Sequence, residues 1–264
     1  MAAIIDLWNQ ETYDGDMVEL LQKSTDIVRG FYQREAEVDA RLAAKPLDSP
    51  WEPIAPNPFT DGKTELRDSL DALLADRTIR TFHYTRLADD EVERLMEVGI
   101  ELSDTAPMRR RLNARVAAGD FSPEQADEIF QASALHSEAY GKRCGMFWTC
   151  GLPYPSDCPG VARLIAMWGG EAAYWTLQDH KVYGPLLRGV GAARIVEVAV
   201  PLDSATHFGG ASGVVVDAYA KSLGFEREIS GLDVCCKDPM PPSSILAIHT
   251  KGDGTFELVG RGYP

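Results

Sequence analysis

The fold is decided by one stretch of sequence, Thr78-Ile-Arg-Thr-Phe-His-Tyr-Thr85. Its β-branched and aromatic residues are typical of a strand. The residues that follow, 88–98, carry acidic side chains at 89–91, which suit the dipole at the start of a helix. Gly99 is expected to end that helix, because glycine readily adopts the left-handed conformation of a C-cap. A strand followed directly by a helix indicates a domain in which helices pack on a sheet.

The rest of the chain extends this pattern in both directions. Further strands are predicted at 145–149, 194–200, 232–236, 245–249 and 256–259, with a hairpin turn at 252–254. Helices are predicted at 14–44, 64–76, 105–119, 122–140, 160–177 and 214–222. The sequence therefore predicts an α+β domain with a mixed sheet over 77–264. A helical segment over 1–76, with a proline-rich connector at 46–62, precedes it.

Bulk composition narrows the classes of partner and compartment. The net charge of −14 repels phosphate backbones and disfavours broad binding of nucleic acid. No stretch approaches the roughly 20 apolar residues that span a bilayer, and the first residues lack the basic start of a signal peptide. The cysteines number five, two of them adjacent at 235 and 236, which favours reduced thiols over a disulfide framework. We expect a cytoplasmic protein that does not enter membranes.

Two segments leave alternatives open. The basic run 108–111, Met-Arg-Arg-Arg, is either a solvated face or a contact for a phosphate or an acidic partner. The segment 209–213, Gly-Gly-Ala-Ser-Gly, is either a flexible loop or the start of a helix whose N-terminus holds an anion. The spacing of Cys144, Cys150 and Cys158 fits no common zinc pattern, so no metal site is predicted.

The deciding strand and the helix after it resemble the first motif of the ADP-ribosyltransferases. The matching residues are Phe82-His83-Tyr84-Thr85, and then Val98-Gly-Ile-Glu-Leu-Ser103 after the helix. In the family branch that uses His, Tyr and Glu, the histidine hydrogen-bonds the adenosine ribose of NAD. The resemblance thus implies that NAD is bound, with His83 on the ribose and Thr85 near the nicotinamide half. Tyr84 departs from the family by replacing a small residue, which would narrow the pocket.

The resemblance also implies further contacts to NAD. Arg86 is close enough along the chain to offer a guanidinium to the pyrophosphate, although a surface charge is the alternative. The family's second motif is an aromatic residue near the end of the next strand, which stacks on nicotinamide. Trp148 occupies that place in the order of elements, and plain core packing is its alternative role.

The family's third motif is a glutamate on a late strand, and the chain offers several substitutes for it. The late strand 229–236 carries Asp233, which is one methylene shorter, and Glu226 and Glu228 lie just upstream as further substitutes. The block 167–175, Met-Trp-Gly-Gly-Glu-Ala-Ala-Tyr-Trp, carries Glu171 beside Tyr174 and resembles, with the strand, a bacterial protein family. Two glycines inside a helix cost stability, so we expect something to approach that backbone closely. Glu171 is either an acid/base or ribose-binding group among aromatics, or a packed and partnered side chain.

Taken together, the resemblance implies NAD-dependent transfer of ADP-ribose with release of nicotinamide. Glu171 or Asp233 would supply the catalytic carboxylate, and His83, Tyr84, Thr85, Arg86, Trp148 and Tyr174 would bind the nucleotide. The acceptor stays open among proteins, small molecules and nucleic acid, with free nucleic acid disfavoured by the charge. The alternatives are a catalytically silent fold of this type that binds a protein partner, or an unrelated hydrolase.

Overall fold

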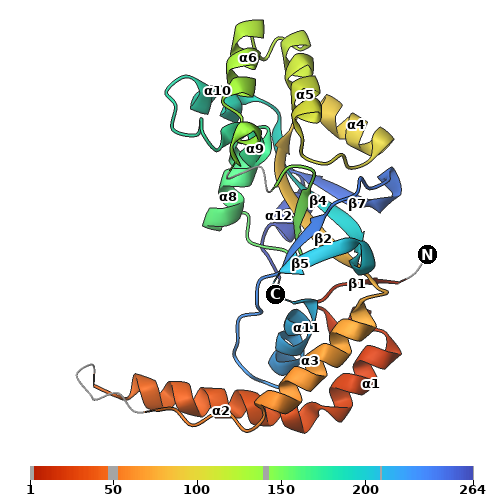
Figure 1. Cartoon of the computed structure of the whole chain (residues 1–264), viewed down its shortest axis with the longest axis vertical. Helices are drawn as coiled ribbons and strands as arrows, with labels where there is room; N and C mark the ends of the chain where they lie inside the picture. Colours follow the sequence, from red (N-terminus) through yellow and green to blue (C-terminus); the bar gives the residue numbers. More distant parts are fainter. Residues whose placement is uncertain (1–2, 47–52, 139–142, 209, 264) are drawn as a thin grey trace. The chain divides into compact units, whose positions relative to one another are not determined.

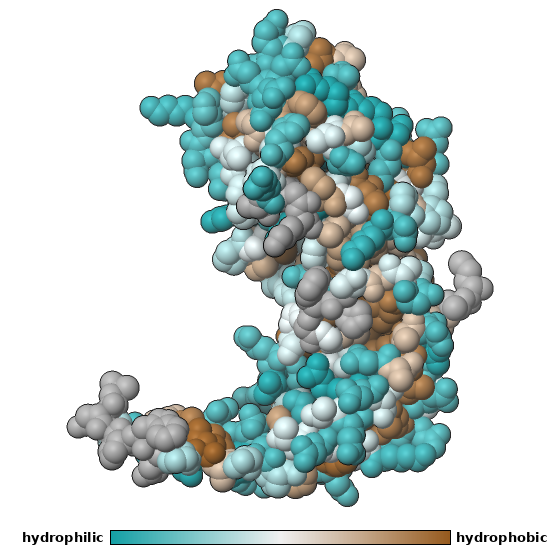
Figure 2. Space-filling view, viewed as in Figure 1, coloured by the Kyte–Doolittle hydropathy of each residue, from teal (hydrophilic) through white to brown (hydrophobic). Residues whose placement is uncertain are grey.

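The chain forms an α+β protein that divides into two compact units. The computed structural model describes residues 3–46, 53–138, 143–208 and 210–263, so residues 47–52 of the proline-rich connector lie outside it. The first unit comprises Met1–Ile79 with Phe208–Leu232, and the second comprises Arg80–His207 with Asp233–Pro264. Figure 1 shows the helices and strands of both. The face seen in Figure 2 is largely hydrophilic, in keeping with the net charge of −14.

The first unit is helical. Its elements are β1 (Ile4–Ile5), η1 (Gln10–Thr12), α1 (Gly15–Lys23), α2 (Thr25–Ala43), α3 (Thr60–Leu74) and α11 (Ala211–Ser222). The predicted single helix over 14–44 is wrong, because the chain breaks at Ser24 between α1 and α2. There the Thr25 hydroxyl donates to the carbonyl of Gln22 at 2.7 Å, a local bond of the kind that competes with helical pairing. β1 pairs in parallel with Thr78 and Ile79.

Helix α11 belongs to the first unit, although the sequence placed it in the domain over 77–264. Val214, Val215 and Val216 are all fully buried, and since consecutive residues face different sides of a helix, α11 requires neighbours on most of its sides. α3 and α2 supply them. The Tyr32 hydroxyl donates to Oδ1 of Asp217 at 2.6 Å, which ties α2 to α11.

The sheet is built from strands that lie far apart in sequence. Its order is β5-β6-β3-β2-β4-β7, from the strands β2 (Thr78–Leu87), β3 (Phe147–Cys150), β4 (Ala192–Pro201), β5 (Ala205–Phe208), β6 (Asp233–Cys236) and β7 (Ile245–Thr250). β3 pairs antiparallel with both β2 and β6. The register places Cys150 beside Phe82 on one side and beside Asp233 on the other. The deciding strand is thus an interior strand, in keeping with its largely buried side chains.

The helices of the second unit confirm some predictions and correct others. They are α4 (Asp89–Val98), α5 (Thr105–Ala117), α6 (Pro123–Gln131), α8 (Pro159–Ala166), α9 (Gly170–Tyr174), α10 (Tyr183–Gly189) and α12 (Gly254–Val259), with 3-10 turns η2 (Ala134–His136), η3 (Leu202–Ser204) and η4 (Pro242–Ser244). The predicted strand 256–259 and its hairpin are wrong, because α12 satisfies that backbone internally instead of pairing it. The predicted helix 122–140 ends at Gln131 in α6, and residues 139–142 lie outside the described residues.

The predicted helix over 160–177 is also two helices. α8 ends at Ala166 and α9 begins at Gly170, with Gly169 at φ +85° between them. The two glycines therefore serve a left-handed turn, and the expectation of glycines inside a continuous helix is wrong. The turn lets Trp168 become fully buried. Its ring packs edge-on against Phe121, with 5.5 Å between the ring centroids, whereas Trp175 is 54% exposed.

Candidate functional site

A cavity of about 600 Å³ opens in the second unit, within the range typical of small-molecule sites. Its walls come from β2, β3, the start of β6 and the helices α4, α5 and α9. The polar residues among those that line it are His83, Tyr84, Thr85, Glu91, Arg94, Glu101, Ser103, Asp104, Arg111, Arg143, Trp148, Thr149, Tyr154, Glu171 and Asp233. The structure therefore brings together six of the eight residues that the sequence singled out, and leaves two outside.

His83 lies at the cavity wall with one ring nitrogen engaged. Its Nδ1 is 2.9 Å from the carbonyl oxygen of Trp148, and its ring centroid lies 4.7 Å from that of Phe147. Burial, and next the nearby charge of Arg111, lower the pKa of His83, while the Trp148 carbonyl opposes the shift. The imidazole is therefore neutral at pH 7. Because a carbonyl only accepts, Nδ1 carries the proton and Nε2 keeps its lone pair for another donor.

The two residues after His83 are buried in the wall. The Tyr84 hydroxyl accepts from the backbone N–H of Tyr154 at 2.6 Å and lies 3.2 Å from the carbonyl of the same residue. Burial raises the pKa of Tyr84, so its hydroxyl stays protonated. Thr85 is 5% exposed and lines the cavity. Tyr84 thus fixes the loop after β3 rather than projecting far into the open space.

Glu171 and Trp148 are linked through Arg143. The Arg143 guanidinium forms an ion pair with Glu171 and lies 5.7 Å from the centre of the Trp148 ring. Glu171 is in the first turn of α9, which the left-handed Gly169 directs toward the cavity. The arrangement puts a carboxylate, an aromatic ring and a cation on one part of the wall.

Asp233 is the second carboxylate of the cavity. It begins β6 and is exposed, beside Cys150 in the register of β3 and β6. Burial raises the pKa of Cys150 to about 12, and the charge of Asp233 adds to the shift. Cys150 is therefore a neutral thiol at pH 7 and a poor nucleophile.

Arg86 and Tyr174 do not line the cavity. The Nε of Arg86 donates to the carbonyl oxygen of Val190 at 2.6 Å, so its guanidinium closes the end of α10 rather than facing the open space. Tyr174 is 3% exposed and belongs to the hydrophobic cluster around Trp168. Tyr174 lies inward because α9 packs its Ala173–Tyr174 side on that cluster.

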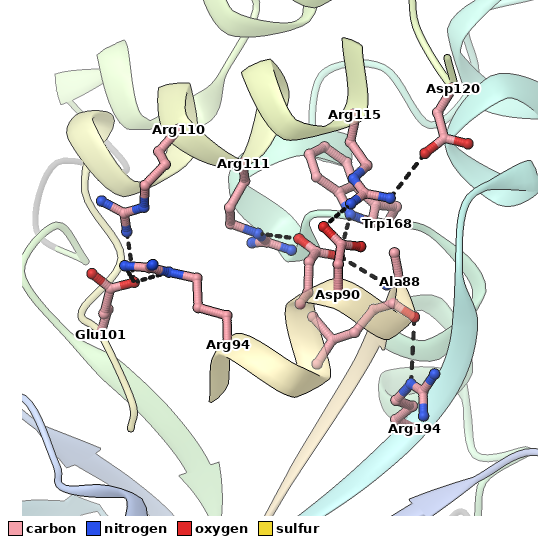
Figure 3. Close-up of polar contacts among 12 residues, drawn as sticks. Ala88, Asp90, Arg94, Glu101, Arg110, Arg111, Arg115, Asp120, Trp168 and Arg194 are labelled. Carbon is pink, nitrogen blue, oxygen red and sulfur yellow. Dashed lines mark hydrogen bonds and ion pairs between the residues drawn. The ribbon is translucent and has the colours of Figure 1, made fainter. Parts of the chain in front are cut away.

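Glu91 and Arg111 are residues of the cavity that the motif comparison missed. The Glu91 carboxylate accepts three hydrogen bonds, from Arg111 Nε at 2.7 Å, Trp168 Nε1 at 2.7 Å and the backbone N–H of Ala88 at 2.8 Å. Figure 3 shows Arg111 descending from α5 onto the start of α4. Its Nη2 is buried and finds no hydrogen-bond partner among the described residues. An orphaned donor on a cavity wall is suited to a ligand or an ordered water.

A second ion cluster extends the same wall. Arg94 from α4 and Arg110 from α5 both donate to Oε2 of Glu101, at 3.2 and 2.6 Å (Figure 3). Arg94 and Glu101 line the cavity, whereas Arg110 supports Glu101 from behind the wall. Only the basic run at 108–111 signalled this cluster in the sequence, and its three arginines pair with Asp127, Glu101 and Glu91 in turn.

Comparison of the chain with protein-family models, curated proteins and solved structures gives no match. Among the described residues, no helix has both the length and the apolar character to cross a membrane. No group of three or more His, Cys, Asp or Glu in the described part of the chain is placed to hold a metal ion.

Proposed function

We propose that the chain binds NAD in this cavity and transfers its ADP-ribose to an acceptor with release of nicotinamide. One observation carries the proposal: His83, Trp148 and Glu171, from three separate segments, line one cavity together with the orphaned donor of Arg111. These four side chains complement four groups of NAD. His83 suits a ribose hydroxyl, Trp148 the nicotinamide ring, Glu171 the cationic ribosyl centre and Arg111 the pyrophosphate.

Each residue has a role that follows from its geometry. His83 Nε2, left unprotonated by the bond from Nδ1 to Trp148, accepts a hydrogen bond from a ribose hydroxyl. The Trp148 ring offers a surface on which nicotinamide stacks. Arg111 takes the part that the sequence gave to Arg86, because Arg111 lines the cavity and its buried Nη2 has no partner among the described residues, whereas Arg86 is held by Val190. Thr85 borders the nicotinamide half.

The chemical step needs a carboxylate. The bond between the ribose C1′ and nicotinamide breaks, and nicotinamide leaves with the electron pair. Glu171 stabilises the resulting ribosyl cation and takes the proton of the acceptor as its oxygen or nitrogen attacks C1′. For this, Arg143 must release Glu171, so binding of the nucleotide has to break the ion pair seen in the unliganded protein.

That ion pair also favours a second function. While Arg143 holds Glu171, the carboxylate is not available to C1′, and the fold would bind a nucleotide or a protein partner without transferring ADP-ribose. The two functions differ in turnover. Transfer or hydrolysis produces nicotinamide in proportion to time, whereas binding alone produces none.

The test measures nicotinamide released from NAD by the wild type and by Glu171→Gln, Asp233→Asn and Glu257→Gln. Glu257 is an exposed residue of α12 and serves as the matched control. We expect Glu171→Gln to lower the rate at least 100-fold and Glu257→Gln to leave it unchanged. A large loss in Asp233→Asn alone would move the catalytic role to Asp233. NAD binding without turnover in the wild type would support the second function.

A further inference from the structure

A cluster of cations in the first unit is unusual for so acidic a chain. Lys63 and Arg67 lie four residues apart on α3, and side chains at that spacing are neighbours on a helix face. Among the described residues neither has a carboxylate oxygen within 4 Å, although both are half-buried. Like charges at this spacing repel, so the pair destabilises the helix unless an anion compensates it.

The surroundings of Lys63 explain how it is held without an ion pair. Its Nζ lies 3.9 Å from the ring centre of Phe31 and 4.8 Å from that of Tyr32. Burial lowers the pKa of Lys63, Asp217 opposes this, and the positive charges of Arg227 and Arg67 lower it further. Asp217 itself is occupied, since it accepts from Tyr32 and from the side chain and backbone of Ser230.

Arg67 lies over the first turn of α11. A Cβ added at Gly210 would lie 2.8 Å from Nη2 of Arg67 and 3.9 Å from Oγ of Ser212, so the guanidinium packs against the backbone at the helix start and the hydroxyl lies nearby. Gly210 has φ +80° and opens the helix.

Two polar atoms near the start of α11 lack hydrogen-bond partners among the described residues. Ser212 is fully buried, and its Oγ has no hydrogen-bond partner among the described residues. The Nε of Arg67 is likewise buried and without a partner in the described part of the chain. Asp71 gives neither atom a hydrogen bond, although its Oδ1 accepts from the backbone N–H of Ser212 at 3.2 Å and places one negative charge at the helix start.

We propose that Arg67 and Ser212 bind a phosphate group at the start of α11, with Lys63 adding positive potential. The guanidinium and the hydroxyl donate to two oxygens of one tetrahedral anion, which would satisfy the orphaned donors and relieve the repulsion between Lys63 and Arg67. The phosphate is either the free ion or the monoester of a small molecule. The site lies within the first unit, and its existence does not depend on the function of the cavity.

The test follows the amide signals of Ala211 to Gly213 by NMR as inorganic phosphate is added to the ¹⁵N-labelled full chain at constant ionic strength. We expect saturable shifts in the wild type, at least tenfold weaker binding in Arg67→Gln, and wild-type binding in Arg29→Gln, which removes an exposed charge from α2. Ser212→Ala should weaken binding three- to tenfold while the thermal midpoint stays the same or rises, because a buried unpartnered hydroxyl is lost.

Glycerol 2-phosphate is titrated in parallel to separate the two sources. Tighter binding of the monoester would assign the site to a phosphorylated small molecule, and tighter binding of phosphate would assign it to the free ion. The proposal is overturned if the wild type shows no saturable response, or if Arg67→Gln, still folded by its spectrum, responds as the wild type does.

Discussion

Nδ1 of His83 and the carbonyl oxygen of Trp148 lie 2.9 Å apart, and this contact sets the chemistry of the cavity. It joins the deciding strand β2 to the neighbouring strand β3 and fixes the imidazole tautomer with Nε2 as an acceptor. The same contact places the histidine beside the backbone of the tryptophan proposed to stack on nicotinamide.

The pH dependence of stability should report the lowered pKa of His83. Its pKa is lowered in the folded protein, so below about pH 6.5 the unfolded chain binds a proton that the folded chain does not. The free energy of unfolding therefore falls as the pH decreases through this window. As the pH decreases, the free energy of unfolding of the wild type should fall more steeply than that of His83→Gln, by up to about 1.4 kcal/mol per pH unit. Denaturant titrations of both proteins from pH 7.5 to 5.5 measure the free energy of unfolding at each pH. Parallel plots of this free energy against pH would contradict the prediction.

Loss of Glu91 should cost more stability than loss of a neighbouring glutamate. Glu91→Ala leaves Arg111, Trp168 Nε1 and the N–H of Ala88 without their acceptor. We expect the free energy of unfolding to fall by about 2–4 kcal/mol. This is less than the full effect for a buried ion pair, because the Arg111 side chain is 29% exposed. Glu93→Ala, an exposed change on the same helix, should lie within about 0.5 kcal/mol of the wild type. Equal effects in urea unfolding would refute the structural role of Glu91.

The left-handed turn before α9 makes a separate prediction. Gly169 has φ +85°, and an added Cβ would lie 2.4 Å from the Cβ of Ala173. Gly169→Ala should therefore destabilise the protein by about 2–4 kcal/mol through strain and overlap. Gly160→Ala is the control, because nothing lies within 4 Å of its added Cβ and α8 gains helix propensity, worth up to about 1 kcal/mol. Thermal unfolding that ranks the two variants the other way would show that this turn is misassigned.

Cys150 should be slow to react with alkylating reagents. Its pKa of about 12 leaves a thiolate fraction at pH 8 that is roughly 10³-fold below that of an ordinary cysteine. Labelling with iodoacetamide, followed by mass spectrometry of the peptide that contains Cys150, measures the rate. Fast labelling of the folded protein at pH 8 would mean that the thiol is less buried than the cavity geometry indicates.

The sequence predicted those elements that carry strong local signals. The acidic start at 89–91 and the stop at Gly99 predicted α4 to within one residue. The segment 256–259 was assigned wrongly because a few apolar residues do not distinguish a strand from one helical turn. The break at Gly169 was missed because two glycines in a helical pattern were interpreted as a close approach rather than as a left-handed turn.

The cavity could be predicted only in part, because most of its contacts are long-range. His83, Tyr84 and Thr85 are consecutive and were found through one motif. The bond between Glu91 and Trp168 joins residues 77 positions apart, and no local pattern reports it. Arg86 was assigned to the pyrophosphate on proximity along the chain, whereas its guanidinium is bonded to Val190 and Arg111 from a distant helix lies at the cavity.

The most direct test of the central claim is calorimetric titration of NAD into the wild type, His83→Ala and Arg111→Gln. We predict saturable binding to the wild type, with each substitution weakening it about tenfold through the loss of one hydrogen bond or ionic contact. Glu257→Gln should bind as the wild type does. Absence of binding to the folded wild type, or equal affinity in all four proteins, would contradict the assignment of the cavity to NAD.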